Sequence, residues 1–237
     1  CTLLLMSSAS AEDLSDGDLS LTANGTDLVL SSDNPKVIHV DDVNGDDSND
    51  GLTPETAIKS FNHIANLPLK AGDEVLLTGT IYTSRDAGHK RMCESLANGE
   101  PLPFDPMDAT IYYVGPTPAK PGTVIGSAGP TTSGRMDAYA PTLIELGQAV
   151  MIGKGERDKK VIDACKKYSA VYLAAAGGAG ALLASSVTDC KVIAFDELLS
   201  EAIYQLNVKD MPLIVAIDTF GNDLFKIGRE KYKNTKE

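Results

Sequence analysis

The stretch AVMIGKGERDKKVIDACKKYSAVYLAA (residues 149–175) contains the pattern that decides the fold. Apolar runs at 149–152 and 170–175 have the length and composition of buried strands. Between them, residues 156–168 are polar, with apolar residues at helical spacing. A strand, a helix and a second strand in this order predict a layered α/β domain.

The same alternation continues on both sides of this stretch. Further strands are predicted at 74–80, 109–114, 123–127, 191–195 and 213–217. Further helices are predicted at 86–98, 179–187 and 196–206. The predicted domain covers residues 67–225, and residues 226–237 form a basic tail. Because the early strands lie close together with little helix between them, the sequence leaves open whether the sheet is wholly parallel.

Charge divides the 237-residue chain into two unlike parts. The formal net charge is −12, from 33 acidic and 21 basic residues. Residues 1–66 hold 12 of the acids and 2 of the bases, a net charge of −10, which leaves −2 for the remainder. An acidic chain is a poor partner for nucleic acid, and no apolar stretch is long enough to span a bilayer. We therefore expect neither nucleic-acid binding nor a membrane span.

The first 66 residues differ in character from the domain that follows. Residues 1–35 start like the end of a secretory signal and continue as an acidic segment, for which we expect poor order. Residues 36–66 predict a short strand, an acidic loop and a helix start. The string VIHVDDVNGDDSNDGLTPETAIKSF resembles the opening of secreted β-helix, adhesin-like proteins, although no second repeat follows. We expect 36–66 to be foreign to the domain and to contact it little.

Several standard chemistries are excluded by their motifs. Gly178 and Gly180 begin a G-x-G, but Leu183 stands where a dinucleotide fingerprint needs glycine. The three histidines are isolated, and the four cysteines show no C-x-x-C spacing. We predict no metal or cluster site on this chain, and we expect the cysteines to be small buried hydrophobic residues.

The segment TVIGSAGPTTSGRMDAYAPTLIELG (123–147) predicts a strand end, a glycine-rich loop and a helix start. Unpaired backbone N–H groups at such a turn suit an anion. Thr131 and Thr132 add hydroxyl donors, and Arg135 adds a planar fork for a carboxylate. The alternative is a capped helix with a surface arginine.

Two more cations follow predicted strands, Arg85 in one case and Lys154 in the other. Ligands of open α/β sheets bind at the carboxyl ends of strands. Three cations at such ends, counting Arg135, indicate a small polyanionic ligand such as a dicarboxylate.

These residues also belong to recognisable motifs. The motifs are TGTIYTSRDAGHKR (78–91), LPFDP (102–106), IYYVGPTPAKPGTVIGSAGPTTSGRMDAY (111–139) and MIGKG (151–155). From about Ala71 to Phe225 the chain resembles the β subunit, or C-terminal domain, of the iron–sulfur fumarate hydratase and L-tartrate dehydratase family. The resemblance implies a swivelling β/β/α domain and a hydro-lyase that interconverts fumarate and malate, with L-tartrate as the alternative substrate.

The resemblance also implies roles for individual residues. Arg85, Arg135 and Lys154 would bind the substrate carboxylates, Thr132 would hydrogen-bond the substrate, and Thr131 would abstract the proton. A threonine hydroxyl is a weak acid and would need activation. One departure is Ser84, where the family has glycine in TGRD.

The family's cofactor implies a partner. The [4Fe–4S] cluster is carried by an α subunit with three cluster-binding cysteines, so we expect a hetero-oligomer that is inactive without that subunit. Such an enzyme belongs in the cytoplasm, whereas the signal-like start predicts export. The alternatives are an exported adhesin-like surface protein and a non-catalytic dicarboxylate-binding domain.

Overall fold

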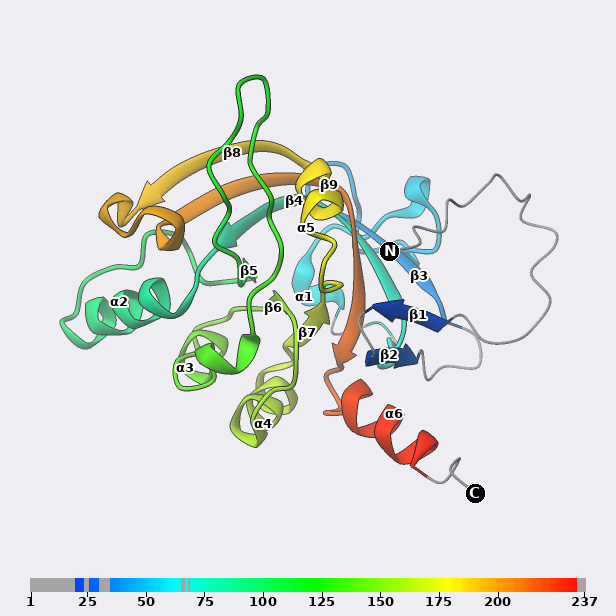
Figure 1. Ribbon diagram of the computed structural model, residues 1–237. Helices are drawn as coiled ribbons and strands as arrows, with labels where there is room; N and C mark the ends of the chain where they lie inside the picture. Colours follow the sequence, from blue (N-terminus) through cyan, green and yellow to red (C-terminus); the bar gives the residue numbers. More distant parts are fainter. Residues whose placement is uncertain (1–19, 24–25, 30–34, 65–66, 68, 234–237) are drawn as a thin grey trace.

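A computed structural model of the chain describes residues 20–23, 26–29, 35–64, 67 and 69–233 (Figure 1). Most of the segment 1–35, with its signal-like start, lies outside these residues. Within it, β1 (Ser20–Ala23) and β2 (Thr26–Val29) pair as an antiparallel hairpin.

Five strands close into a barrel. Four of them run parallel to one another, namely β4 (Glu74–Thr83), β5 (Thr110–Tyr112), β6 (Val150–Gly153) and β7 (Val171–Ala174). The long β9 (Ile203–Ile217) pairs antiparallel with both β7 and β4, and this closes the ring. The predicted α/β class is confirmed. The sequence left open whether the sheet is wholly parallel, and the structure shows that it is mixed.

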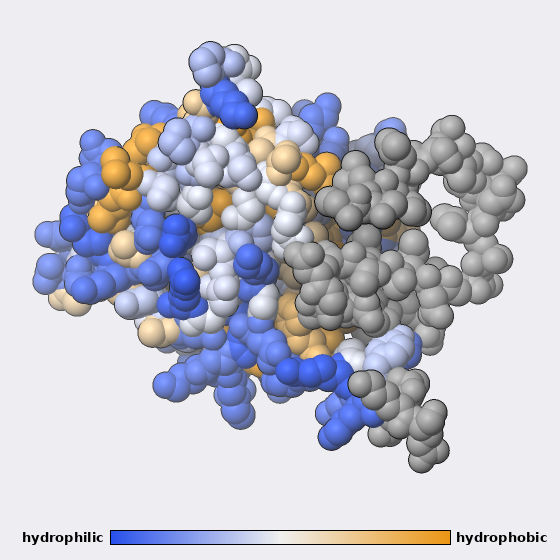
Figure 2. Space-filling view, viewed as in Figure 1, coloured by the Kyte–Doolittle hydropathy of each residue, from blue (hydrophilic) through white to orange (hydrophobic). Residues whose placement is uncertain are grey.

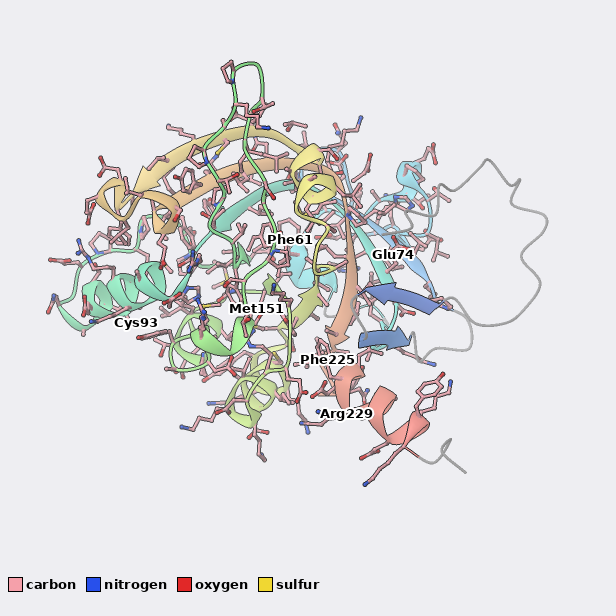
Figure 3. The ribbon with its side chains drawn as sticks, in the orientation of Figure 1. Phe61, Glu74, Cys93, Met151, Phe225 and Arg229 are labelled. Atoms are coloured by element: carbon pink, nitrogen blue, oxygen red, sulfur yellow. The ribbon has the colours of Figure 1, made fainter. Side chains whose placement is uncertain are left out.

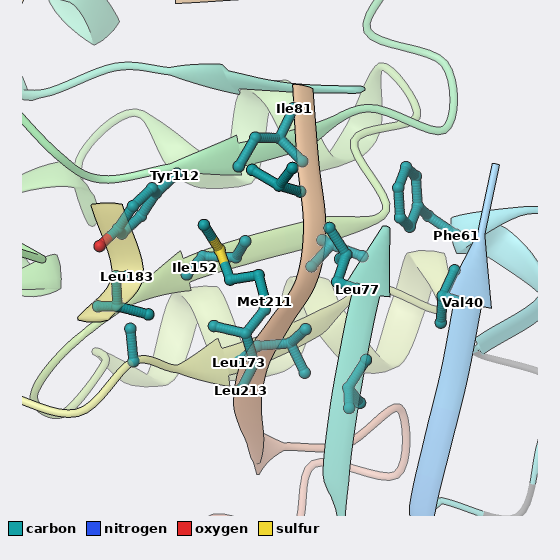
Figure 4. Packing of buried hydrophobic residues seen from close by; sticks show 14 of the residues in the cluster. Val40, Phe61, Leu77, Ile81, Tyr112, Ile152, Leu173, Leu183, Met211 and Leu213 are labelled. Atoms are coloured by element: carbon teal, nitrogen blue, oxygen red, sulfur yellow. The ribbon is translucent and has the colours of Figure 1, made fainter. Parts of the chain in front are cut away.

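β5, β6 and β7 are buried on both faces, which explains their continuous apolar runs, whereas buried and half-buried residues alternate along β4. In β6, Val150 and Ile152 pack into the cluster enclosed by the barrel, where Figure 4 shows Ile152. Met151 packs into a second cluster outside the barrel. Three helices cover this outer cluster, namely α2 (Asp86–Ala97), α3 (Ala140–Glu145) and α4 (Lys159–Tyr168).

Residues 36–64 are part of the same domain. β3 (Val37–Asp41) pairs in parallel with the first half of β4. The next residue, Asp42, accepts a hydrogen bond from the Thr80 backbone N–H at 2.7 Å. Gly79 leaves room for this carboxylate, since a Cβ there would lie 2.3 Å from the Asp42 Cγ. The expectation that 36–66 would contact the domain little is therefore wrong.

The rest of this segment also packs inward. η1 (Pro54–Thr56) begins at its N-cap Thr53, as predicted, and α1 (Phe61–Ile64) follows. Ile58 and Phe61 are buried in the inner cluster, where Figure 4 shows Phe61 beside Val40 and Leu77. Ile58 reaches the core from an isolated bridge with Val40, and not from a helix.

The chain after α5 (Gly180–Ser185) differs most from prediction. β8 (Val187–Ala194) and β9 form a long antiparallel hairpin. Only η3 (Asp196–Glu201) is helical where 196–206 was predicted as a helix, and from Ile203 the chain is already strand. Buried residues such as Leu206, Val208 and Met211 pack inside the barrel, and this non-local pairing outweighs the local helical pattern.

No strand forms at the predicted 123–127. Residues 115–129 instead make a long loop that extends past β8 in Figure 1. Ile125 and Ala128 are buried in the inner cluster, so the apolar run anchors the loop without pairing.

The last element that the structure describes is α6 (Leu224–Tyr232), so the predicted tail is helical as far as Tyr232. Figure 2 shows that hydrophilic residues dominate the visible surface over α4 and α6. Among the described residues, no helix is long and apolar enough to cross a membrane.

Candidate functional site

The carboxyl ends of β4, β5 and β6 lie at one edge of the barrel, because these strands are parallel neighbours. Arg85 comes two residues after β4, and Lys154 comes directly after β6. The chain that leaves β5 between them runs through Tyr113 to Gly115. Two of the three predicted cations therefore follow the ends of β4 and β6, the two strands that flank β5.

The loop 115–129 returns its far end to the same edge. The Thr131 backbone N–H donates to the Tyr113 carbonyl oxygen at 2.8 Å. Thr132 pairs with Lys154 in a parallel bridge, and the Ser133 N–H donates to the Lys154 carbonyl at 2.9 Å. Both predicted threonines are thus held between the ends of β5 and β6.

A short 3-10 helix, η2 (Ser133–Met136), follows and carries Arg135 on its exposed side. Ser133 is buried, and its hydroxyl lies 2.9 Å from the Tyr172 hydroxyl on β7. Gly153 makes this close packing possible, since a Cβ there would lie 2.0 Å from the Ser133 Oγ. The predicted helix start is therefore a 3-10 turn, and α3 begins later, with Pro141 in its first turn.

The three cations differ in their partners. The Arg85 side chain is 23% exposed and its Nη2 lies 3.1 Å from the Glu201 Oε1. Lys154 and Arg135 are exposed, and within the described part of the chain neither forms an ion pair. Unpaired cations beside exposed hydroxyl groups can bind an anion.

A buried arginine that the sequence did not single out supports this edge. The Arg157 side chain is 0% exposed, and its Nε donates to the Asp137 Oδ1 at 2.6 Å. Its guanidinium lies between the rings of Tyr113 and Tyr172, with centroids 5.2 and 5.1 Å away. Burial would lower the pKa of Arg157, but Tyr113 and Asp137 raise it above its ordinary value, so the charge is retained. The residue follows a polar run, and nothing in the sequence marked it as buried.

His89, on the buried face of α2, supports the turn at Arg85. Its Nδ1 lies 3.0 Å from the Arg85 carbonyl oxygen and 2.7 Å from the Ser84 hydroxyl. Because the carbonyl can only accept, Nδ1 carries the proton. Burial lowers the pKa of His89 to about 4, so the ring is neutral near pH 7. Ser84 is fully buried without a left-handed backbone, so the turn accepts serine in place of glycine.

No activating group contacts the Thr131 hydroxyl among the residues that the structure describes. Its residue is half-buried, and its hydroxyl makes no hydrogen bond to the described residues. A base that removes a proton from the hydroxyl must therefore come from elsewhere if Thr131 is to act as one.

The described cysteines do not fit a cluster site. Cys93 lies on α2, Cys165 on α4 and Cys190 on β8, and Figure 3 shows Cys93 apart from Met151 of the barrel. Burial raises the pKa of the Cys165 thiol to about 12, which disfavours the thiolate that metals bind. No group of three His, Cys, Asp or Glu side chains among the described residues is arranged to hold a metal ion.

Acidic side chains of the loop 41–51 have a structural role. Asp47 accepts from the backbone N–H groups of Lys59 at 2.9 Å and Ser60 at 2.8 Å. Asp46 and Asp50 likewise accept from loop N–H groups, which lowers the pKa of each carboxyl. These carboxylates hold the loop in shape.

A sequence model described as fumarase C-terminus matches residues 55–228. The match covers the barrel, the strand-end site and η3. It begins inside the segment 36–66 that was predicted to be foreign.

The curated relatives differ in how much of their length this chain covers. Fumarate hydratase 2 of Leishmania major is 41% identical over 156 residues, which are 65% of this chain and 28% of that protein. The aerobic class I fumarate hydratase of Escherichia coli (strain K12) is 42% identical over 152 residues, 63% of this chain and 28% of the relative. The putative L(+)-tartrate dehydratase subunit beta of Methanocaldococcus jannaschii is 41% identical over 176 residues, 71% of this chain and 90% of the relative. The chain thus spans about a quarter of the fumarate hydratases and most of the tartrate dehydratase subunit.

Proposed function

The chain belongs to the fumarase C-terminus family, and on this premise we propose that it is the β component of an iron–sulfur hydro-lyase. The proposed reaction is the reversible addition of water to fumarate, giving malate. We further propose that the barrel is the swivelling type of β/β/α domain, which the closed ring of five strands supports.

The observation that carries the proposal is the strand-end edge. Lys154 and Arg135 are exposed cations without ion pairs among the described residues, and Arg85 follows β4 at the same edge of the barrel. The backbone of Thr132 forms a bridge with the backbone of Lys154, so both residues are held at this edge. A planar dicarboxylate needs cations for both ends and few other groups, which is what this edge offers.

The residues of this chain would act by binding and by charge stabilisation. Removal or addition of a proton beside a carboxylate builds negative charge on that carboxylate, and fixed cations such as Arg85 and Lys154 stabilise it. Thr132 would orient the substrate, and we assign proton transfer to Thr131. The [4Fe–4S] cluster, which we place on the α subunit, would supply the Lewis acid for the hydroxyl group.

L-tartrate is the second candidate substrate. The relative that this chain covers almost end to end is named a tartrate dehydratase subunit beta, and the equivalent subunit of Escherichia coli (strain K12) is 32% identical over 174 residues. Fumarate and L-tartrate both present two carboxylates to the same cations. The adhesin-like alternative loses its support because β3, Ile58 and Phe61 pack into the family domain.

Reconstitution tests the proposal. The full chain is purified alone and after co-expression with an α subunit, and hydration of fumarate and dehydration of L-tartrate are measured. We expect a colourless, inactive chain and a brown, active complex. Activity of the chain alone would contradict the need for a partner, and a complex inactive on both substrates would leave a non-catalytic binding domain.

A further inference from the structure

Glu201, at the end of η3, holds Arg85 from outside the strand-end edge. Its Oε1 lies 3.1 Å from the Arg85 Nη2, and its Oε2 accepts from the Ala87 backbone N–H at 3.0 Å. Both carboxylate oxygens are therefore engaged, one by the guanidinium and one by the first turn of α2. The Glu201 side chain is 22% exposed, so it is not freely solvated.

The carboxylate also caps α2. Arg85 is the N-cap residue of this helix and makes no side-chain capping bond. The first N–H groups of a helix need acceptors, and a negative charge there is favourable. Glu201 supplies both from a position 114 residues further along the chain.

Backbone encloses the same guanidinium on another side. A Cβ on Gly115 would lie 2.8 Å from the Arg85 Cδ and 2.9 Å from its Nη1. The same Cβ would lie 2.8 Å from the Ser200 carbonyl oxygen of η3. Arg85 is thus confined between the chain leaving β5 and η3.

We propose that Glu201 is the positioning residue for Arg85, and that it presets the guanidinium for a substrate carboxylate. This inference rests on the proposed function for the identity of the ligand. A free arginine side chain loses much rotamer freedom on binding, and an arginine that is already fixed loses less. The opposite role, a carboxylate that competes with the substrate, predicts an effect of opposite sign.

The structure provides a matched control. Glu197, also on η3, pairs with Arg91 of α2, with Oε1 2.9 Å from Nη2. This second link between η3 and α2 is exposed, at 54% for Glu197 and 48% for Arg91. Glu197→Gln removes the same charge from the same element without touching Arg85.

Glu201→Gln separates the two roles. Glutamine has no charge and only one acceptor oxygen, so it cannot reproduce the arrangement in which one oxygen binds Arg85 and the other binds the Ala87 N–H. In the complex with the α subunit, we expect the KM for fumarate or L-tartrate to rise about fivefold and kcat to fall by a smaller factor. A less fixed Arg85 binds the substrate carboxylate more weakly, and it also stabilises the charge that develops there less well. Glu197→Gln should leave KM unchanged. An unchanged or lower KM for Glu201→Gln would overturn the proposal.

A second readout needs neither substrate nor partner. In the full chain labelled with ¹⁵N-arginine, the signal of the Arg85 Nη–H groups, one of which contacts Glu201, is assigned by its loss in Arg85→Lys. We expect Glu201→Gln to shift this signal to that of a solvated arginine, and Glu197→Gln to leave it in place. An unmoved signal would overturn the positioning role even if the complex is active. A moved signal with a complex inactive on both substrates would support the positioning role and refute the proposed function.

Discussion

At the scale of single residues, the strand-end edge is supported by a buried charged residue beneath it. Arg157 is buried between two tyrosine rings and bound to Asp137, whose second oxygen accepts from the Asp158 N–H at 2.7 Å. This arrangement ties the chain after η2 to the start of α4. A buried charge of this kind is costly to leave without its partner.

Arg157→Met should therefore be strongly destabilising. The variant leaves the Asp137 carboxylate without its cation, and we expect the free energy of unfolding to fall by about 3–5 kcal/mol. Urea denaturation followed by circular dichroism measures this.

The control for this prediction is Arg229→Met. Arg229 bonds to Glu156 at 2.7 Å with side chains 62% and 50% exposed, and its position at the surface is visible in Figure 3. An exposed pair contributes at most about 1 kcal/mol. Equal losses for the two variants would show that Arg157 is no more than a surface charge.

His89 makes stability depend on pH. Burial lowers its pKa to about 4 in the folded chain, below its ordinary value of 6.5. As the pH falls, the unfolded chain therefore binds the proton before the folded chain does. The contribution of His89 to the free energy of unfolding is fully present above about pH 6.5 and is lost progressively down to about pH 4. The loss amounts to about 3 kcal/mol for such a shift.

His89→Gln should flatten this dependence. Urea midpoints measured between pH 7 and pH 4 should fall less steeply in the variant than in the parent chain, and His63→Gln serves as the control. Parallel curves for His89→Gln and the parent would refute a depressed pKa at His89.

At the scale of elements, β6 and η2 meet through one glycine. A Cβ on Gly153 would lie 2.0 Å from the Ser133 Oγ and 3.0 Å from the Tyr113 Cδ2. A side chain there would push η2 away from β6. Thr132 would then move away from the backbone of Lys154, with which it pairs.

Gly153→Ala should therefore cost about 1–3 kcal/mol of stability by overpacking. Differential scanning fluorimetry of the full chain checks the loss. Gly177→Ala is the control, because nothing lies within 4 Å of a Cβ at Gly177. A Gly153→Ala chain as stable as the control would mean that η2 yields freely.

Elements were predictable where both faces are buried. β6 and β7 are short runs in which every residue is buried, and the sequence shows them as such. The run at 123–127 looks similar, but it only docks Ile125 in the core. The β8–β9 hairpin was missed because β9 is stabilised by partners far along the chain.

At the scale of the whole molecule, the fold brings together residues whose importance the sequence predicted but whose proximity it did not show. Arg85, Thr131, Thr132 and Lys154 were predicted from motifs, and parallel pairing brings their backbones to one edge. Glu201 was not predicted, because nothing in the sequence links it to Arg85, which lies far earlier in the chain. Its partnership with Arg85 depends on the closure of the barrel by β9.

For residues 1–66, the prediction from charge was misleading. Its net charge of −10 suggested a foreign piece, yet its apolar residues Ile58 and Phe61 belong to the core. Charge describes the surface of a segment, whereas apolar spacing describes what it packs against.

The most direct test of the central claim concerns Lys154. It is exposed and makes no ion pair among the described residues, so Lys154→Met should leave the fold intact. Lys160→Met removes the same charge from the exposed side of α4. The measurement is kcat/KM of the complex with its α subunit, for fumarate and for L-tartrate. We expect Lys154→Met to lower kcat/KM about 100-fold on the true substrate and Lys160→Met to change it less than about twofold. Full activity of Lys154→Met on both substrates would contradict a dicarboxylate site at this edge of the barrel.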